Sequence, residues 1–184
     1  ARLDAGRELR REEVDLVGLL VDTVADARAA GPDHDWQLDL AVLEPPADAT
    51  PEEAEDFLPE PPLVIGDEAR LRQVVVNLLA NARVHTPAGS HVTTTLAREG
   101  DTLIVRIHDD GPGIAPDVRD RLFERFARGD SSRERRTGST GLGMSIALAI
   151  VQSHGGSIDV DSSTAPEDHG TTFSVRLPAA TVEE

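Results

Sequence analysis

The sequence predicts one α/β domain with two layers, in which a mixed β-sheet is covered by helices on one face. Apolar residues recur at helical spacing in three stretches, and six shorter stretches have the alternation or composition of strands. Their order is helix, strand, strand, helix, two strands, helix and two strands. The 184 residues suffice for one such core, and 39% hydrophobic with 28% charged residues is a globular composition.

The first part of the chain begins with a charged, helix-favouring stretch at 1–13 that is too short to be a domain. Residues 15–31 then predict a helix, with Asp15 as its N-cap and Gly31 as its C-cap. Its inward face consists of Leu16, Leu19, Leu20, Val24 and Ala27. The stretch WQLDLAVL at 36–43 alternates in polarity and predicts a strand.

The middle of the chain predicts a strand, a helix and a hairpin. The strand PLVIGD at 62–67 ends in Asp67, which can cap a helix at about 68–85. The inward residues of this helix are Leu71, Val74, Val75, Leu78, Leu79 and Ala82. HVTTTLAR and TLIVRIHDD then predict a β-hairpin whose turn is REGD.

The last elements are an apolar helix and two strands. The helix GLGMSIALAIVQSHGG has a glycine-rich first turn and ends at Gly155 and Gly156. The strands SIDVDS and TTFSVRLP follow it, joined by a polar turn at 163–170.

Composition and charge restrict the function. The chain has 34 acidic against 18 basic residues, a net charge of −16, which argues against a nucleic-acid partner. Residues 44–62 hold seven acids, six prolines and no base, and predict a mobile, solvated acidic loop. By contrast, residues 119–136 hold seven arginines against four acids. The absence of cysteine excludes disulfides and thiolate metal sites, and no apolar run approaches the roughly 20 residues of a membrane span.

Two asparagines lie four residues apart on the predicted helix 68–85, so Asn77 and Asn81 share one face. They are either polar surface positions or a pair of amide oxygens for a hard cation. Mg²⁺ prefers such ligands when it keeps several waters and also binds phosphates.

Two glycine-rich stretches also suggest a ligand. The first, DDGPGI at 109–114, can be an ordinary turn. Alternatively, it is a loop in which Asp109 or Asp110 accepts a hydrogen bond from a ligand, while the glycines let the backbone approach that ligand. TGLGM at 140–144 begins a helix, where exposed N–H groups and the helix dipole favour a phosphate.

Together these stretches resemble the catalytic, ATP-binding domain of bacterial sensor histidine kinases. The wider superfamily includes type II topoisomerases, the ninety-kilodalton chaperones and mismatch-repair ATPases. RLRQVVVNLLANA resembles the asparagine box and DDGPGI the first glycine box. LFERF at 122–126 resembles the phenylalanine box, and TGLGMSIALAIVQSHGG the second glycine box with its helix.

The resemblance covers residues 14 to 178 and implies a Bergerat-type ATP-binding fold. It also implies that residues 1–13 are the tail of a dimerisation hairpin with its linker, that 14–180 are the kinase domain and that 181–184 are a C-terminal tail. Within the kinase domain, 44–62 would be an acidic insertion and about 127–140 an ATP lid.

The resemblance also implies roles for residues of the site. Asp109 accepts a hydrogen bond from the adenine amino group, and Gly111 and Gly113 shape the loop that passes the purine. Asn81, with Asn77, coordinates the Mg²⁺ that bridges the phosphates of ATP. The other implied binding residues are Ile114 in the first glycine box, Thr140, Gly141, Leu142 and Gly143 at the phosphates, and Thr172, which supports Asp109.

The sequence departs from the family pattern at Val84 and His85. Many members have a Lys-Tyr pair there, of which the Lys reaches phosphate and the Tyr covers adenine. His85 can still stack on the base, but Val84 supplies no charge. We expect an arginine of the lid to replace it, and Arg128 is the candidate, with Arg133, Arg135 and Arg136 as alternatives.

Position 77 favours one reaction over another. Superfamily members that hydrolyse ATP with water have a general-base Glu where this chain has Asn77, and an amide cannot take a proton from water. This favours transfer of the γ-phosphoryl group to a protein nucleophile, with Asn77 and Arg128 as the catalytic residues. The six histidines are not followed by the acceptor pattern of the family, so the acceptor His is expected on a separate domain.

The resemblance implies several partners: the protein's own dimerisation and phospho-acceptor domain, the receiver domain of a response regulator, and a second copy in a homodimeric parent. It places this domain in the cytoplasm, with the parent in the cell membrane. Two alternative functions are a nucleotide-binding regulatory module without phosphotransfer and an anti-sigma-type serine kinase.

Overall fold

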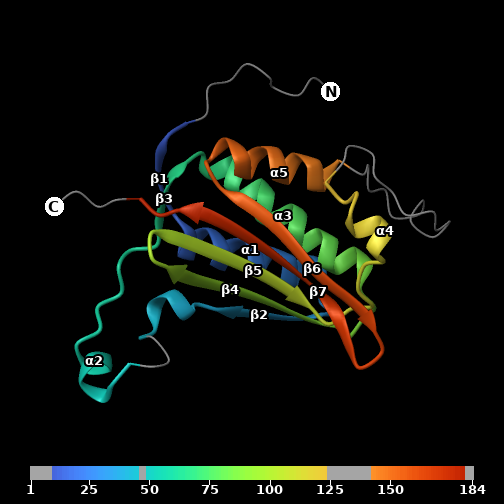
Figure 1. Ribbon diagram of the computed structural model, residues 1–184, viewed down its shortest axis with the longest axis horizontal. Coiled ribbons are helices and arrows are strands. Elements are labelled where there is room, and N and C mark those ends of the chain that lie inside the picture. The colour runs from blue at the N-terminus through green and yellow to red at the C-terminus, as the bar shows by residue number, and fades with distance from the viewer. Residues whose placement is uncertain (1–9, 46–48, 124–141, 181–184) are drawn as a thin grey trace.

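Five strands form one mixed sheet, and three helices lie together on one of its faces (Figure 1). The computed structural model describes residues 10–45, 49–123 and 142–180. The strand order is β2 (Asp35–Asp39), β4 (His91–Glu99), β5 (Thr102–Asp109), β7 (Asp168–Pro178) and β6 (Ser157–Ala165). Strand β2 is parallel to β4, and the other neighbouring pairs are antiparallel. The predicted two-layer α/β class is therefore confirmed.

The covering helices are α1 (Leu16–Ala30), α3 (Glu68–His85) and α5 (Gly143–Ser153). All six predicted inward residues of α3 are buried. Asp15 caps α1 by accepting a hydrogen bond from the Val17 N–H at 2.9 Å, and Asp67 caps α3 through the Arg70 N–H at 3.2 Å. Each large aliphatic side chain that these helices bury stabilises the fold by roughly 1.5–3 kcal/mol.

The predicted strand at 36–43 is shorter than expected. The strand β2 ends at Asp39, and a 3₁₀ turn, η1 (Ala41–Leu43), follows it. Leu40 leaves the extended region with φ −105° and ψ 55°, and the Leu43 N–H bonds back to its carbonyl at 2.9 Å. The turn still buries Val42, so the polarity pattern of the sequence is kept although the backbone is no longer a strand.

A second, two-stranded sheet joins β1 (Glu12–Asp15) to β3 (Leu63–Gly66). The predicted helix-favouring stretch at 1–13 is wrong at its end, because Glu12 and Glu13 lie in β1; residues 1–9 lie outside the described residues. Val14 and Val64 pair across the two strands, and both are buried. Burial of this valine pair outweighs the helix propensity of the charged residues before it.

The two β-hairpins differ in one respect from the prediction. The β4–β5 hairpin has the expected turn, with Gly100 at φ +57°. Strands β6 and β7, however, extend through most of the predicted turn at 163–170, so that only Pro166 and Glu167 lie between them.

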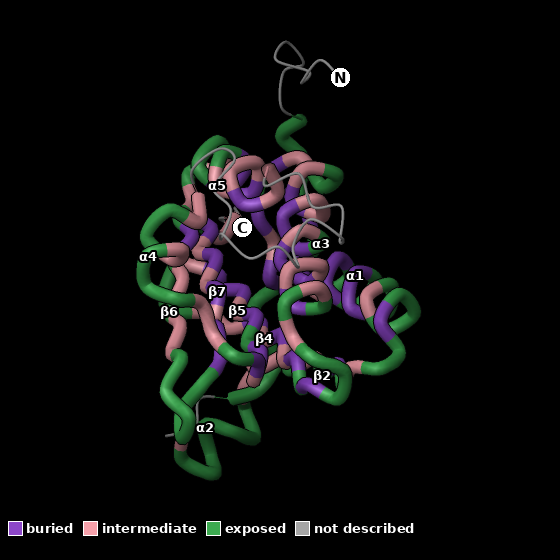
Figure 2. The backbone as a smooth tube through the Cα atoms, turned by 90° about the vertical axis from the view of Figure 1, so that its right-hand side faces the viewer, coloured by how far each residue is buried: buried purple, intermediate pink, exposed green. Residues whose placement is uncertain are grey.

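The acidic segment contains one short helix, α2 (Pro51–Glu55), where a loop was expected. Its start is fixed by a capping box in which Thr50 and Glu53 bond to each other's backbone. Figure 2 shows α2 as an exposed arm at the edge of the molecule. Arg98 holds the end of this arm through the Glu60 carboxylate at 2.8 Å and the Pro61 carbonyl at 3.1 Å. Across the described ranges, no helix is long and apolar enough to cross a membrane.

Candidate functional site

Three of the predicted site segments meet at one end of the sheet. These are the C-terminal half of α3, the loop that follows β5, and the start of α5 (Figure 1). The Asn77 side chain on α3 donates a hydrogen bond to the carbonyl of Gly143, the first residue of α5, at 3.1 Å. His85, at the end of α3, is close enough to Asp109 to influence its charge.

Asp109 is the last residue of β5, and only 5% of its surface is exposed. Burial raises the pKa of this carboxyl, while the hydrogen bond from the Gly111 N–H to Oδ1, 3.1 Å long, opposes that rise. The second oxygen, Oδ2, has no hydrogen-bond partner among the described residues. A buried carboxylate with one free oxygen is an acceptor for a donor on a ligand.

Asp110 is engaged elsewhere. Its carboxylate accepts hydrogen bonds from the His91 backbone N–H at 2.8 Å and from His91 Nδ1 at 3.0 Å. Burial alone would raise the pKa of Asp110, but these hydrogen bonds and the electrostatic interaction with His91 together outweigh burial and lower the pKa. Of the two carboxylates that the sequence left open, Asp109 therefore has the geometry to accept a bond from a ligand.

The loop after β5 needs its glycines. A Cβ on Gly111 would lie 2.5 Å from Cγ2 of Thr86, at the end of α3. Gly113 has φ +75°, and a Cβ there would overlap the Ser163 carbonyl. Beyond them, the Ile114 N–H donates to Ser162 Oγ at 2.8 Å, so the loop lies directly against β6.

One face of α3 carries Asn77, Asn81 and His85 at four-residue intervals. The amide nitrogen of Asn77 is used by Gly143, which leaves its oxygen free for a ligand. Asn81 is half-buried and makes no hydrogen bond to any described residue. The described residues contain no group of three or more His, Cys, Asp and Glu side chains that could hold a metal ion. The donor set thus fits a cation held by amide oxygens and by the oxygens of a bound anion.

The start of α5 is open to a ligand. Leu142 is its N-cap and makes no side-chain capping hydrogen bond, and the helix begins at Gly143. The Leu142 carbonyl accepts from the Ile146 N–H at 2.9 Å and from Ser145 Oγ at 3.0 Å. The first N–H groups of an eleven-residue helix therefore remain without an intrahelical partner, next to Asn77.

The prediction for Thr172 is wrong. Thr172 pairs with His108 across β5 and β7, and their side chains bond to each other at 2.9 Å. Side chains alternate along a strand, so Thr172 faces away from Asp109. The register instead places Thr171 opposite Asp109, where it is buried and bonded to Ser162 at 2.9 Å.

Several predicted residues lie outside the described residues: Thr140, Gly141, Arg128, Arg133, Arg135, Arg136 and the whole lid at 127–140. Of the stretch at 122–126, only Leu122 and Phe123 are described, and both pack against the core.

Two residues of the site had no signal in the sequence. His169, the second residue of β7, bonds to the Gly111 carbonyl at 2.8 Å, and Ser162 of β6 accepts a hydrogen bond from the Ile114 N–H. Each is a single polar residue in a strand, without the spacing or motif that marks a ligand-binding position.

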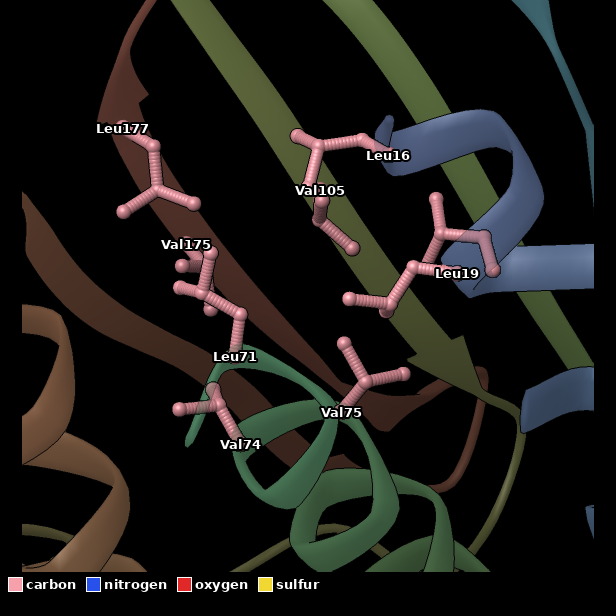
Figure 3. Close-up of a pocket in the computed structure, with 9 residues that line it drawn as sticks. Leu16, Leu19, Leu71, Val74, Val75, Val105, Val175 and Leu177 are labelled. Atoms are coloured by element: carbon pink, nitrogen blue, oxygen red, sulfur yellow. The ribbon is translucent and has the colours of Figure 1, made fainter. Parts of the chain in front are cut away.

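The cavity shown in Figure 3 is not the site. It lies inside the core, between α1, α3 and the sheet, and leucine and valine side chains such as Leu19, Val75 and Val105 line it. It presents no side chain that could bind a charged ligand.

Comparison with known proteins identifies relatives of the whole chain. A family model described as histidine kinase-, DNA gyrase B- and HSP90-like ATPase matches residues 66–181. The probable sensor histidine kinase TcrY of Mycobacterium tuberculosis is 49% identical over 178 residues, which are 97% of this chain and 33% of TcrY. The sensor histidine kinase WalK of Bacillus subtilis is 40% identical over 114 residues, 61% of this chain and 18% of WalK. The chain thus spans about a third of the length of the first of these relatives.

Solved structures agree with the fold. The mycobacterial sensor histidine kinase MprB matches with a TM-score of 0.74 and 29% identity, over 93% of this chain and all (100%) of that one. Full-length ShkA in complex with AMPPNP matches with a TM-score of 0.73 and 28% identity, over 98% of this chain and 33% of ShkA. The predicted resemblance is confirmed by these matches.

Proposed function

Because the chain belongs to the family of histidine kinase-, DNA gyrase B- and HSP90-like ATPases, we propose that it is the ATP-binding catalytic domain of a two-component sensor histidine kinase. In this function it transfers the γ-phosphoryl group of ATP to a histidine on a separate domain.

The proposal rests mainly on the burial and hydrogen bonding of Asp109. A carboxylate is buried at the end of β5, with one oxygen held by a loop N–H and the other free. This arrangement suits the exocyclic amino group of adenine, which donates a hydrogen bond. A guanine offers a carbonyl oxygen at the same position, and two facing acceptors repel. The site should therefore select adenine over guanine.

The phosphates would lie between α3 and the start of α5. The free N–H groups of the first turn of α5 attract an anion. Asn81, with the oxygen of Asn77, would hold Mg²⁺, which neutralises charge on the phosphates. The lid arginine would add positive charge, and Arg128 remains our candidate for that role.

The same residues favour transfer over hydrolysis. Asn77 is an amide whose nitrogen is bonded to Gly143, and it cannot act as a general base on water. Catalysis would then consist of positioning and charge neutralisation, while the acceptor imidazole of the partner domain supplies the nucleophile.

The partners follow from this function. We propose that the parent protein is a homodimer in the cell membrane, with its own dimerisation and phospho-acceptor domain and a receiver domain as the next acceptor. The stretch 1–13 would be the end of that dimerisation hairpin and its linker.

A second function is favoured by one observation. Val84 and His85 replace the Lys-Tyr pair of many family members, and the half-buried Val84 supplies no cation for the phosphates. A module that binds nucleotide without transferring phosphate would have this feature. Both proposed functions include nucleotide binding, and they differ in whether the γ-phosphoryl group is transferred.

Titration calorimetry with ADP, GDP and ATP, with and without Mg²⁺, tests the binding function that both proposals share. We expect ADP and ATP to bind, GDP to bind at least about tenfold more weakly, and Mg²⁺ to strengthen ATP binding. Equal affinity for ADP and GDP would contradict the role of Asp109, and absence of nucleotide binding would contradict the proposed function as a whole.

A further inference from the structure

We propose that His169 is a positioning residue for base recognition: its imidazole holds Gly111 in the orientation that keeps Asp109 free to accept a hydrogen bond from adenine. The inference rests on the proposed function, since it concerns how the same site reads the base.

A short chain of hydrogen bonds links the three residues. His169 Nδ1 lies 2.8 Å from the carbonyl oxygen of Gly111. A carbonyl only accepts, so Nδ1 carries the proton and donates it, whether the ring is neutral or charged. The N–H of the same glycine donates to Oδ1 of Asp109 at 3.1 Å. The imidazole thus fixes the Gly111 carbonyl, and the Gly111 N–H orients the Asp109 carboxylate.

The loop needs this anchor at its middle. Asp110, at its start, is held by His91, and Ile114, at its end, is held by Ser162 at 2.8 Å. Between them, glycine has more backbone freedom than any other residue. Within the described ranges, His169 is the one side chain that bonds to the Gly111 carbonyl.

The position of His169 is itself rigid. It lies in the β6–β7 ladder opposite Thr164, and the next residue, Gly170, has φ +150°. A Cβ at Gly170 would lie 2.6 Å from the carbonyl oxygen of Asp109, so the start of β7 lies directly against the end of β5, its neighbour in the sheet. The imidazole is therefore delivered to the loop by the sheet and not by a flexible segment.

Loss of the imidazole has an electrostatic consequence. Burial raises the pKa of Asp109, and the Gly111 N–H lowers it. The titratable groups that face Asp109 are His108 on β5, His85 on α3 and Asp110 in the loop. Without His169, Gly111 turns more freely and its N–H bond to Asp109 weakens. The pKa of Asp109 then rises further. Because only the ionised carboxylate accepts with both oxygens, nucleotide binding is lost as the pH falls, and this loss begins at a higher pH in the variant.

Two substitutions at one position test the inference. His169→Leu keeps the bulk of the side chain but removes the donor, whereas His169→Asn keeps an N–H donor near the position of Nδ1 and cannot titrate. The affinities for ADP and purine riboside diphosphate would be measured by calorimetry from about pH 5 to 8. This second ligand has only a hydrogen atom where adenine has its amino group, so it neither donates to Asp109 nor repels it and reports on the remainder of the site.

We expect His169→Leu to weaken ADP binding on the order of tenfold and to shift the pH midpoint upward. His169→Asn should stay within about threefold of the unmodified chain, and purine riboside diphosphate should bind equally to all three. The inference is overturned if His169→Leu binds ADP normally, if His169→Asn loses as much affinity as His169→Leu, or if binding of purine riboside diphosphate weakens as much as binding of ADP. If the unmodified chain binds no ADP, the proposed function fails and the inference fails with it.

Discussion

At the scale of single residues, the environment of Asp109 makes Asp109→Asn the sharpest substitution. The amide oxygen of Asn can still accept from the Gly111 N–H, but its nitrogen presents donors where Asp109 has a free acceptor. We expect ADP binding to weaken by about 2 kcal/mol or more, since a hydrogen bond to a charged group contributes about 1.5–3 kcal/mol. Calorimetry measures the change, and a thermal melt checks that the variant is folded.

Asp110→Asn is the matched control. The Asp110 carboxylate is bonded to His91 and is not expected to touch the nucleotide. Its ADP affinity should change by less than about threefold. If a folded Asp109→Asn variant binds ADP as the unmodified chain does, Asp109 does not belong to the site.

Asn81 is proposed to act only through the metal. Because it makes no hydrogen bond within the described part of the chain, Asn81→Ala should change stability by less than about 0.5 kcal/mol. We expect the variant to lose the Mg²⁺ dependence of ATP binding and to keep metal-free ADP binding. Equal loss of both ligands in calorimetry would show a structural role instead.

The sequence predicts the site residues unevenly, for a physical reason. Asn77, Asn81 and Asp109 lie within motifs whose spacing indicates their role. Thr172 is predicted to support Asp109, whereas the register of β5 with β7, which local sequence does not specify, places Thr171 opposite Asp109. His169 bonds to a residue 58 positions away, a contact that local sequence does not encode.

At the scale of elements, α3 and α5 are antiparallel, and they are joined by a hydrogen bond near each end of α5. Asn77 and Gly143 make one junction. At the other, His154 at the end of α5 accepts a hydrogen bond at Nε2 from the Asp67 N–H at 3.0 Å. Its Nδ1 donates to the Ile150 carbonyl at 2.7 Å, which fixes the tautomer.

His154→Ala should therefore destabilise the fold. It leaves the Asp67 N–H without its partner at the start of α3, and such an unpaired group costs about 1–3 kcal/mol. Urea denaturation measures this as a lower free energy of unfolding. Gln152→Ala, at an exposed position of the same helix, should change it by less than about 0.5 kcal/mol. Equal stability of the two variants would contradict the proposed junction.

The elements that the sequence predicts best are those with long periodic patterns. The helix expected at about 68–85 is α3 itself, Glu68–His85, because six buried residues repeat on one face. Short elements were predicted less well. The strand β1 is four residues of mixed polarity, and it is stabilised by its pairing with β3 and by burial of Val14, neither of which is local in the sequence. The strand β2 ends before the 3₁₀ turn η1, and the sequence does not show this end because the turn residues continue the alternating polarity of a strand.

At the scale of the whole molecule, the positions of the histidines bear on the reaction. All six are described, and none makes a hydrogen bond to Asn77, Asn81 or Gly143 among the described residues. Four are bonded close to the end of β5: His34 through Thr86, His91 through Asp110, His108 through Thr172 and His169 through Gly111. His85 lies near Asp109, and His154 lies at the far end of α5. The imidazole that shares a helix face with Asn81 is that of His85, and it lies toward Asp109, where we propose that adenine binds, and not toward the start of α5.

Incubation with γ-labelled ATP and Mg²⁺ tests the central claim most directly. The chain is incubated alone and together with the dimerisation hairpin of its parent protein, and acid-labile label is measured on each. We expect no label on the chain alone, since transfer needs an imidazole in line with the γ-phosphorus. We expect slow labelling of the hairpin, because the two parts lack the effective concentration that a tether provides. Robust label on the chain alone, or an unlabelled hairpin despite measured ATP binding, would contradict the proposed histidine kinase function.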